Sequence, residues 1–538
     1  MTAGEDSDDI VAERPDPLSP GRPYEWVGAW SERRARLTPD AEGLVDRTTG
    51  ERFTYAELDR RANRAARLLR EAGVDRGDRV AVISRNRPAL VDLFFATAKT
   101  GSVLAPISHR LAAPELAALL DGVDPEVLIV EEAFDDLGGK VLAHDDLEGE
   151  PTTFSLATGG EHTWPAYTEA LPKDDSPVDR PPLSMDDPHL LLHTGGSTGL
   201  PKETILTHGG LVWNSVNTIT AWGLRAEDVT PLTFPMFHTG GWNVLTVPIF
   251  HMGGTVVIAR EFDPVDVLRT IDEEGATVLV AVPAMYRMVC EAGAWGDVDL
   301  STLRFAKSGG GPARESVMQA WWEREVDLSQ GYGLTECGPN NFAMPDGWDR
   351  EKADSVGVPA PHVDARVVDE EGQPVEHGEV GELELAGPHA AAGYWGNPEE
   401  TRETFGPGET DEEDEGWVST GDLARVDEDG YYHVEGRKKN MFVSGGENVY
   451  PPEIEDAIAD HPTVEEVVVV PVEDEQWGQV GKAVIEGGES LTLEDLREFL
   501  DGRLARFKHP RHLAFVDELP TSGPSKIDRD ALREQHHE

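Results

Sequence analysis

The sequence is poor in cysteine and in long apolar runs. Its 538 residues include two cysteines, Cys290 and Cys337, too few for a disulfide framework or a cysteine-based zinc site, which suits a reducing cytosol. No apolar run has the length needed to cross a membrane, so we expect no integral membrane segment. The first ten residues, MTAGEDSDDI, lack the apolar core of a secretory signal, which indicates a cytoplasmic protein.

Positive charge is scarce as well. Acidic residues number 102 against 47 lysines and arginines, only 11 of which are lysines, and the formal net charge is −55. Nucleic acid and anionic membrane surfaces are therefore improbable partners. Acid spread over the whole chain is typical of halophilic proteins, which work in a salt-rich cytoplasm where screening weakens self-repulsion.

The chain is long enough to predict two or more domains. Strand and helix patterns alternate through the first two thirds, as in "DRVAVISRN" (78–86) followed by the helical "ALVDLFFATAKTG" (89–101), which favours α/β layers. Short β segments follow from about Asp364. We predict an acidic extension over residues 1–24, a large N-terminal domain over 25–436 and a small α+β domain over 437–538.

The last domain has its own pattern of elements. A proline-started helix, "PPEIEDAIADH" (451–461), leads to the apolar strand "VEEVVVVPV" (464–472). A second helix is expected over 491–507, followed by a strand over 512–519. The basic segment "RLARFKHPRH" (503–512) either binds the phosphates of a ligand or forms the basic end of the second helix.

The segment "HTGGSTGLPKE" (193–203) gathers glycines, hydroxyls and one lysine, whose backbone N–H, hydroxyl and ammonium groups can converge on phosphate. It is not a P-loop, because Pro201 precedes Lys202 and Glu203 stands where that motif has a magnesium-binding hydroxyl. Composition alone favours an ordinary surface loop.

Other segments decide between these two interpretations. They are "PMFHTGGW" (235–242), "SGGGPA" (308–313), "GYGLTE" (331–336), "STGDLARVDEDGYYHVEGRKKN" (419–440) and "LPTSGPSKIDR" (519–529). Their order and spacing, over about residues 25 to 535, resemble the acyl- and aryl-CoA synthetases of the adenylate-forming superfamily. The resemblance implies that a carboxylic acid and ATP give an acyl-adenylate and pyrophosphate, and that the thiol of CoA then gives acyl-CoA and AMP. It implies ATP, Mg²⁺ and CoA, and a monomer or homodimer.

The resemblance assigns the nucleotide site residue by residue. The phosphate loop comprises Thr194, Gly195, Gly196, Ser197, Thr198, Gly199 and Lys202. The adenine walls comprise Gly309, Gly310, Gly311, Gly331, Tyr332 and Gly333. Thr335 contacts the α-phosphate and Glu336 ligates Mg²⁺, which prefers hard oxygen ligands. Asp422 accepts hydrogen bonds from the ribose hydroxyls with help from Arg437, although "TGDL" would also suit a helix N-cap. Glu203 replaces the usual glycine after the lysine and is expected to point outward.

The catalytic step is assigned to Lys526, which bridges the carboxylate and the α-phosphate and would then leave with the C-terminal domain. Ser525 stands where the family usually has glycine, so the path of this loop stays open. The hinge is placed near Lys439 and the CoA channel at Gly445, Gly446 and Glu447. His238 resembles a gate for the thiol, although a buried structural histidine is an alternative.

Trp242 and Met285, at the place where the family has its acyl pocket, suggest an apolar pocket that fits a monocarboxylic apolar acid. The segments "SGGENVYPPEIE" (444–455) and "FHTGGWNVLTVPIFHMGG" (237–254) resemble most the medium- or long-chain fatty-acid branch, with an aryl or succinylbenzoate-type acid as the alternative. A luciferase-like oxygenase is disfavoured by Val443, where that branch usually has lysine. An amino-acid adenylation domain would normally have an aspartate near residue 237, and a non-catalytic nucleotide-binding regulator would not need both Lys202 and Lys526.

Overall fold

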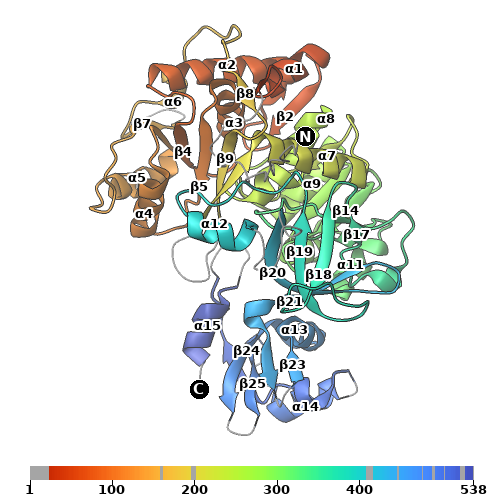
Figure 1. Ribbon diagram of the computed structural model, residues 1–538. Helices are drawn as coiled ribbons and strands as arrows, with labels where there is room; N and C mark the ends of the chain where they lie inside the picture. Colours follow the sequence, from red (N-terminus) through yellow and green to blue (C-terminus); the bar gives the residue numbers. More distant parts are fainter. Residues whose placement is uncertain are drawn as a thin grey trace, which may run out of the picture.

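The computed structural model describes residues 23–157, 162–194, 202–406, 416–444, 447–474, 477–487, 491–501, 503–521 and 527–536. A large body carries the first part of the chain, and a smaller unit formed by the last hundred or so residues lies below it (Figure 1). Within the described ranges, no helix is long and apolar enough to cross a membrane.

The first sheet has six strands in the order β10-β9-β5-β4-β6-β7. The central strands β4 (Arg79–Ile83), β5 (Val103–Ile107) and β6 (Val127–Val130) are parallel and buried, which explains their continuous apolar sequences. Side chains alternate between two helical layers: Val80 and Val82 pack with α2 and α3, whereas Ala81 and Ile83 pack with α4 and α5. The other elements are α2 (Tyr55–Glu71), α3 (Pro88–Thr100), α4 (Ala113–Val123), α5 (Asp135–Leu142), β7 (Thr152–Ser155), β9 (Pro188–Thr194) and β10 (Lys202–Thr207).

The second part of the body repeats the α/β plan. One sheet has the order β11-β12-β2-β3, and a neighbouring sheet has the parallel order β13-β14-β15. The strands are β2 (Glu42–Asp46), β3 (Arg52–Thr54), β11 (Val229–Pro231), β12 (Thr255–Ile258), β13 (Val278–Ala281), β14 (Phe305–Ser308) and β15 (Leu328–Gln330). The helices are α7 (His208–Trp222), α8 (Thr246–Met252), α9 (Pro264–Glu274), α10 (Pro283–Glu291) and α11 (Glu315–Trp322).

The last part of the body is an antiparallel sheet in the order β18-β19-β20-β21. Its strands are β18 (Asp364–Val368), β19 (Gly381–Ala386), β20 (Trp417–Val426) and β21 (Tyr432–Arg437). Short elements complete the body: α1 (Trp30–Leu37), α6 (Tyr167–Ala170), α12 (Pro398–Phe405), β1 (Pro23–Tyr24), β8 (Leu183–Ser184), β16 (Phe342–Ala343) and β17 (Val358–Pro359).

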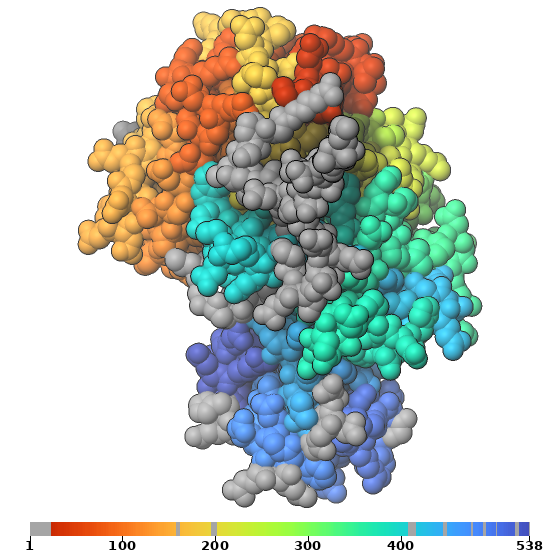
Figure 2. Space-filling model, viewed as in Figure 1, coloured from red at the N-terminus to blue at the C-terminus, as the bar shows by residue number. Residues whose placement is uncertain are grey.

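The C-terminal unit has a sheet in the order β23-β22-β25-β24, with β26 added parallel to β25. In Figure 2 this unit is the blue lobe, and α12 lies in the cyan region above it. Its elements are β22 (Phe442–Ser444), β23 (Glu447–Val449), α13 (Pro451–Ala459), β24 (Val464–Asp474), β25 (Gly478–Gly487), α14 (Leu493–Leu500), β26 (His512–Val516) and α15 (Arg529–His536).

The predicted fold class is confirmed: α/β layers come first, then a β segment, then a small α+β unit. The helix expected over 491–507 is wrong beyond Leu500, where α14 ends and Asp501 turns to an extended conformation. The sequence Asp501-Gly502 is a typical turn signal, which explains the early end.

Candidate active site

The two glycine-rich segments predicted to enclose adenine lie side by side. They follow β14 and β15, whose last residues Ser308 and Gln330 are paired, and the Gly331 amide donates to the Ser308 carbonyl (2.7 Å). A Cβ on Gly309 would approach nothing closer than the Gly331 carbonyl oxygen at 3.9 Å, and one on Gly311 would meet nothing within 4 Å. This open space lies at the carboxyl ends of parallel strands, the usual place for a ligand in an α/β sheet.

Two glycines in these segments are required by the chain itself. Gly310 has a φ of +84°, which glycine adopts without strain. A Cβ on Gly333 would lie 2.3 Å from backbone carbon atoms of Pro339. These positions shape the turn, whereas Gly309 and Gly311 leave room beside it.

Tyr332, Asp422 and Arg437 form the first polar corner of the site. The pairing of β20 with β21 places Asp422 opposite Arg437, and the Arg437 Nε lies 2.6 Å from Asp422 Oδ1. The Tyr332 hydroxyl donates to Asp422 Oδ2 (2.5 Å). Each carboxylate oxygen has a second lone pair, so Asp422 can still accept from ligand hydroxyls.

Asp422 is buried inside β20, so a helix N-cap role at this position is wrong. Burial raises the pKa of its carboxyl above the usual value, although the Arg437 guanidinium and the Tyr332 hydroxyl act to lower it. Burial, together with the Asp422 charge, raises the pKa of the Tyr332 phenol well above its usual range. The Tyr332 ring also meets the Phe342 ring edge-on at 5.8 Å.

Glu336 lies at the other end of the same segment and forms the second polar corner. Its Oε1 accepts a hydrogen bond from the Tyr394 hydroxyl (2.9 Å), and its carbonyl accepts one from the Ala391 amide (2.8 Å). No donor among the described residues reaches Oε2, so this oxygen is available to a hard cation. The neighbouring Thr335 is buried.

Lys202 joins this second corner from the start of β10. Its ammonium lies 5.2 Å from the centre of the Tyr394 ring and forms an ion pair with Glu400 at the start of α12. Burial lowers the pKa of Lys202, and the carboxylates of Glu336 and Glu403 oppose that shift. Lys202 and Glu336 thus contact the same tyrosine, Tyr394, the lysine at its ring and the carboxylate at its hydroxyl.

Of the other residues of the predicted phosphate loop, only Thr194 is among the described residues. Thr194 ends β9 directly opposite Lys202, and its hydroxyl lies 3.5 Å from the Lys202 carbonyl oxygen. The predicted contacts of Gly195, Gly196, Ser197, Thr198 and Gly199 fall outside the described residues.

The expectation that Glu203 points outward is wrong. Its side chain is buried, and its Oε1 has no hydrogen-bond partner among the described residues. Burial raises the pKa of this carboxyl to about 8, so it is mostly protonated at neutral pH and does not repel a triphosphate as a charged group would. Glu203 lies opposite His193 in the pairing of β10 with β9.

His238 is exposed on the loop before the π-helical turn Gly240–Val244. It lies near enough to His193 to affect that residue electrostatically: the pKa of His193 falls to about 4 because of burial and, secondarily, the His238 charge. The His193 ring stacks on Phe237 at 5.9 Å. An exposed position next to other rings fits the predicted gate better than a buried structural histidine.

The two residues assigned to the acyl pocket lie in different clusters. Trp242 is fully buried, stacks on Phe94 at 4.8 Å and donates from Nε1 to the Met236 carbonyl (2.5 Å). Met285 is partly buried and packs against the separate cluster that contains Tyr286. The assignment of Trp242 and Met285 to the pocket stays a prediction.

The predicted hinge residue, Lys439, lies in the short helix Lys438–Asn440. Its ammonium is 3.6 Å from Asp530, and its carbonyl accepts a hydrogen bond from Arg533 (3.1 Å), both on α15. Lys526, Gly445 and Gly446 lie outside the described residues, as does the side chain of Glu447, which begins β23.

The basic segment 503–512 does not form the end of a helix, because α14 stops at Leu500. Its basic side chains form ion pairs within the C-terminal unit: Arg503 with Asp460, Arg506 with Asp501, and Lys508 with Glu453. These ion pairs give the basic side chains partners within the protein, so their presence does not require a phosphate ligand.

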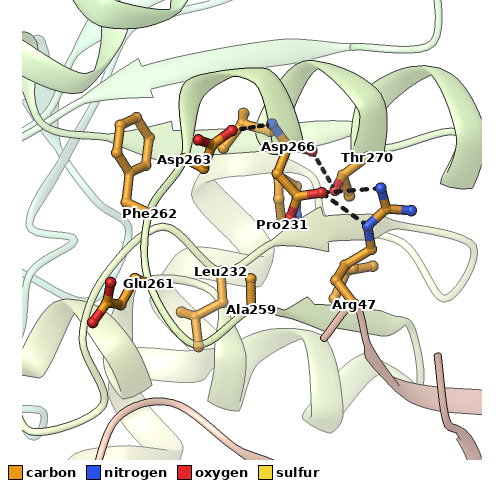
Figure 3. Close-up of a pocket in the computed structure, with 11 residues that line it drawn as sticks. Arg47, Pro231, Leu232, Ala259, Glu261, Phe262, Asp263, Asp266 and Thr270 are labelled. Atoms are coloured by element: carbon orange, nitrogen blue, oxygen red, sulfur yellow. Dashed lines mark hydrogen bonds and ion pairs between the residues drawn. The ribbon is translucent and has the colours of Figure 1, made fainter. Parts of the chain in front are cut away.

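A small cavity lies elsewhere, between β11, β12 and α9 (Figure 3). Its volume is about 10 Å³, enough for roughly one water. Arg47 reaches across it to Asp266, with 3.0 Å between Nη2 and Oδ1. The cavity is too small for a substrate.

Sequence reasoning missed Tyr394 and Glu400. Both belong to "GYWGNPEET" (393–401), where an aromatic residue follows a glycine and a proline-started helix begins. That pattern signals a turn before a helix, but nothing in it indicates contact with Lys202, nearly two hundred residues earlier.

Comparison with known proteins finds one enzyme family that matches most of the chain. The AMP-binding enzyme family model matches residues 31–395, and the model of the AMP-binding enzyme C-terminal domain matches residues 453–526. A feruloyl-CoA synthase of Amycolatopsis sp is 39% identical over 94% of this chain and 98% of its own length. An indoleacetate–CoA ligase of Aromatoleum aromaticum is 35% identical over 94% and 98%, and a long-chain-fatty-acid–CoA ligase of Mycobacterium tuberculosis is 32% identical over 95% and 98%.

Solved structures agree with these relatives. An anthranilate CoA ligase in complex with anthranoyl-AMP superposes with a TM-score of 0.85 at 26% identity, covering 96% of this chain and 98% of the other. ATP-bound MatB from Rhodopseudomonas palustris gives a TM-score of 0.85 at 29% identity, covering 95% and 99%.

Proposed function

This chain belongs to the AMP-binding enzyme family and is an AMP-forming acid–CoA ligase, and from that premise we propose that it activates an aromatic carboxylic acid. The relatives named for feruloyl-CoA and indoleacetate–CoA formation share 39% and 35% identity with it. Behind Trp242, the rings of Phe94, Phe95 and Phe250 pack in series at 4.8, 5.5 and 5.6 Å, so aromatic side chains back the tryptophan directly. A cavity of about 230 Å³ lies on the other side of Phe95 and Phe250. While Trp242 and Phe94 stay stacked, a flat, compact acid fits in front of them better than a long alkyl chain, which would have to pass them to reach that cavity.

One observation carries the placement of the adenylation site. Tyr332 and Glu336, four residues apart, contact the Asp422 corner and the Lys202 corner respectively. Four residues span at most about 14 Å, a length comparable to that from the ribose to the outer phosphates of ATP. One short segment therefore connects a hydroxyl-binding carboxylate with a phosphate-binding lysine.

In the first half-reaction, an acid oxygen attacks the α-phosphorus, the bond to the bridging oxygen breaks, and pyrophosphate leaves. Lys202 and the hydroxyls of the phosphate loop supply donors to the leaving group, while Asp422 and Arg437 hold the ribose. Glu336 would hold Mg²⁺, which supplies charge neutralisation on the phosphates. Lys526 is assigned to the reacting centre, where its ammonium would neutralise charge as the bond forms.

In the second half-reaction, the CoA sulfur attacks the acyl carbon, its proton is released, and AMP leaves. Rotation about Lys439 would withdraw Lys526 and bring 444–451 to the site. The contacts of Lys439 with Asp530 and Arg533 would have to change in that motion, because α15 follows the Lys526 segment directly.

The experiment is a pyrophosphate-release screen with ATP, Mg²⁺ and CoA in molar KCl over ferulate, indoleacetate, benzoate, succinylbenzoate, octanoate and palmitate. We expect at least one aromatic acid to exceed both fatty acids by about tenfold or more in kcat/KM, roughly the discrimination that pocket shape alone supplies. Preference for palmitate or octanoate would overturn the aromatic assignment.

A fatty acid is the second candidate. It is supported by the relative from Mycobacterium tuberculosis named for long-chain fatty acids, which is 32% identical. The alkyl chain could be taken up by the cavity beside Phe95 and Phe250 if Trp242 or Phe94 moved aside, because their stacked rings lie in front of it. Substituting Trp242→Ala should then raise activity on palmitate rather than abolish it.

A further inference from the structure

Tyr394 lies between Lys202 and Glu336, the two charged residues of the second polar corner, which we call the phosphate corner. Its hydroxyl donates to Glu336 Oε1 (2.9 Å), and its ring centre is 5.2 Å from the Lys202 ammonium. The side chain is buried, with 7% of its surface exposed. One tyrosine thus contacts the carboxylate through its hydroxyl and the cation through its ring face.

The backbone around Tyr394 is held from two sides. On the β10 side, the Ile205 amide donates to the Gly393 carbonyl (2.9 Å) and the Ala392 amide donates to the Ile205 carbonyl (2.9 Å). The Trp395 amide donates to the Glu203 carbonyl (2.7 Å). On the other side, the Ala391 amide donates to the Glu336 carbonyl (2.8 Å). Residues 391–395 therefore connect the strand that begins with Lys202 to the segment that ends with Glu336.

Glu400 adds a third charge to the corner. It stands in the first turn of α12, where Asn397 Oδ1 accepts a hydrogen bond from its amide (3.2 Å), and its carboxylate forms an ion pair with Lys202. About a third of the Glu400 side chain is exposed (34%), against 22% for Lys202. A carboxylate on this lysine occupies the place that a phosphate oxygen would take.

We propose that Tyr394 is a positioning residue that holds the Lys202 ammonium and the Glu336 carboxylate at the separation that magnesium-bound ATP requires, and that Glu400 occupies Lys202 until the phosphates displace it. The proposal rests on the proposed function, which assigns Lys202 and Glu336 to the phosphates and the metal. Glu336 Oε2, which no donor among the described residues reaches, fits a metal ligand whose other oxygen is fixed by the tyrosine.

The two residues have opposite expected effects on binding. Glu400→Gln removes a partly exposed competitor, and such ion pairs are worth about two- to fivefold, so ATP should bind more tightly by about that factor with or without Mg²⁺. Tyr394→Phe keeps the ring beside Lys202 but leaves Glu336 without its donor. A hydrogen bond to a charged group is worth about ten- to a hundredfold, so magnesium-dependent ATP binding should weaken by at least about fivefold while metal-free binding scarcely changes.

The test is equilibrium titration of the full chain with ATP, in Mg²⁺ and in EDTA, without acid or CoA so that no turnover occurs. Glu399→Gln is the control for Glu400→Gln, because Glu399 is the exposed neighbour in the same helical turn. Tyr55→Phe is the control for Tyr394→Phe, since it removes another buried hydroxyl that donates to a carbonyl, that of Gly254 (2.6 Å). Both controls should bind ATP as the parent does.

The outcomes separate this inference from the proposed function. Unchanged ATP affinity in Glu400→Gln would overturn the competitor role. Equal weakening of Tyr394→Phe in Mg²⁺ and in EDTA, or none in either, would overturn the positioning role. A parent protein that fails to bind ATP under both conditions would overturn the proposed function and this inference together.

Discussion

The two polar corners of the site are built differently. In the first corner, which the proposed function assigns to the ribose and which we call the ribose corner, Asp422 and Arg437 lie opposite each other on paired antiparallel strands. Asp422 is buried there, with both oxygens in contact with protein donors. In the phosphate corner, Lys202 and Glu336 come from distant segments, remain partly exposed, and meet through Tyr394 and Glu400.

The difference suggests that one corner binds the nucleoside while the other binds and releases the charged phosphates. Strand register fixes the ribose corner before a ligand arrives, which suits a group that stays the same throughout the reaction. Under the proposed function, the phosphate corner accepts a triphosphate and then releases pyrophosphate, and its partly exposed ion pair can exchange partners at small cost. We therefore expect substitutions in the two corners to act on different steps.

The largest effect is expected from Lys526, which belongs to neither corner. Lys526→Ala should slow acyl-adenylate formation by about a thousandfold or more, because positioning and charge neutralisation at the reacting centre are both lost. Thioester formation from supplied acyl-adenylate should be nearly unchanged, since in the proposed function the C-terminal domain turns away with Lys526 before that step. Rapid-quench measurement of each half-reaction tests this, and equal loss in both would contradict the two-conformation account.

The next effect sharpens the contrast between the corners. Asp422→Asn keeps the shape of the side chain but removes the charge that faces Arg437, so kcat/KM for ATP should fall by about ten- to a hundredfold. Asp228→Asn is the control, because Asp228 is another buried aspartate paired with an arginine, Arg304 (2.7 Å), outside the site. It should lower stability and leave the KM for ATP unchanged; an equal change in KM would show that the Asp422 effect is not local.

Some of this arrangement could be predicted from the sequence. The apolar pattern predicts a strand within 78–86 and a helix over 89–101; the strand is confirmed at 79–83, shorter at its end, and the helix at 88–100. Asp422 and Arg437 were expected to act together, and the β20–β21 register brings them together. The outward orientation expected for the Glu203 side chain is wrong, because nothing in the local sequence shows that its strand packs against residues 391–395. Tyr394 was missed for the same reason: its partners are distant in the chain, and tertiary contacts of that kind leave no local pattern.

The smallest effect concerns stability and comes from Glu203, next to the phosphate corner. Its carboxyl titrates near 4.5 when unfolded and at a pKa of about 8 when folded, so between these values the unfolded chain releases a proton that the folded chain keeps. Stability from this group therefore falls as pH rises from about 4.5 to 8 and changes little outside that window. Glu203→Gln removes the titrating group. The melting temperature of the variant should therefore fall less between pH 5 and pH 8 than that of the parent, by roughly a few degrees. Parallel melting curves for parent and variant, in molar KCl at pH 5 and pH 8, would contradict the buried, protonated carboxyl.

The central claim is that Lys202 and its corner serve the departure of pyrophosphate, and single-turnover pyrophosphate release at saturating ATP without CoA tests it most directly. The parent should release pyrophosphate only when the acid is present. Lys202→Ala should release it about ten- to a hundredfold more slowly, yet form thioester from supplied acyl-adenylate at the parent rate, because that step has no β- or γ-phosphate to bind. Pyrophosphate release by Lys202→Ala at the rate of the parent would contradict the account.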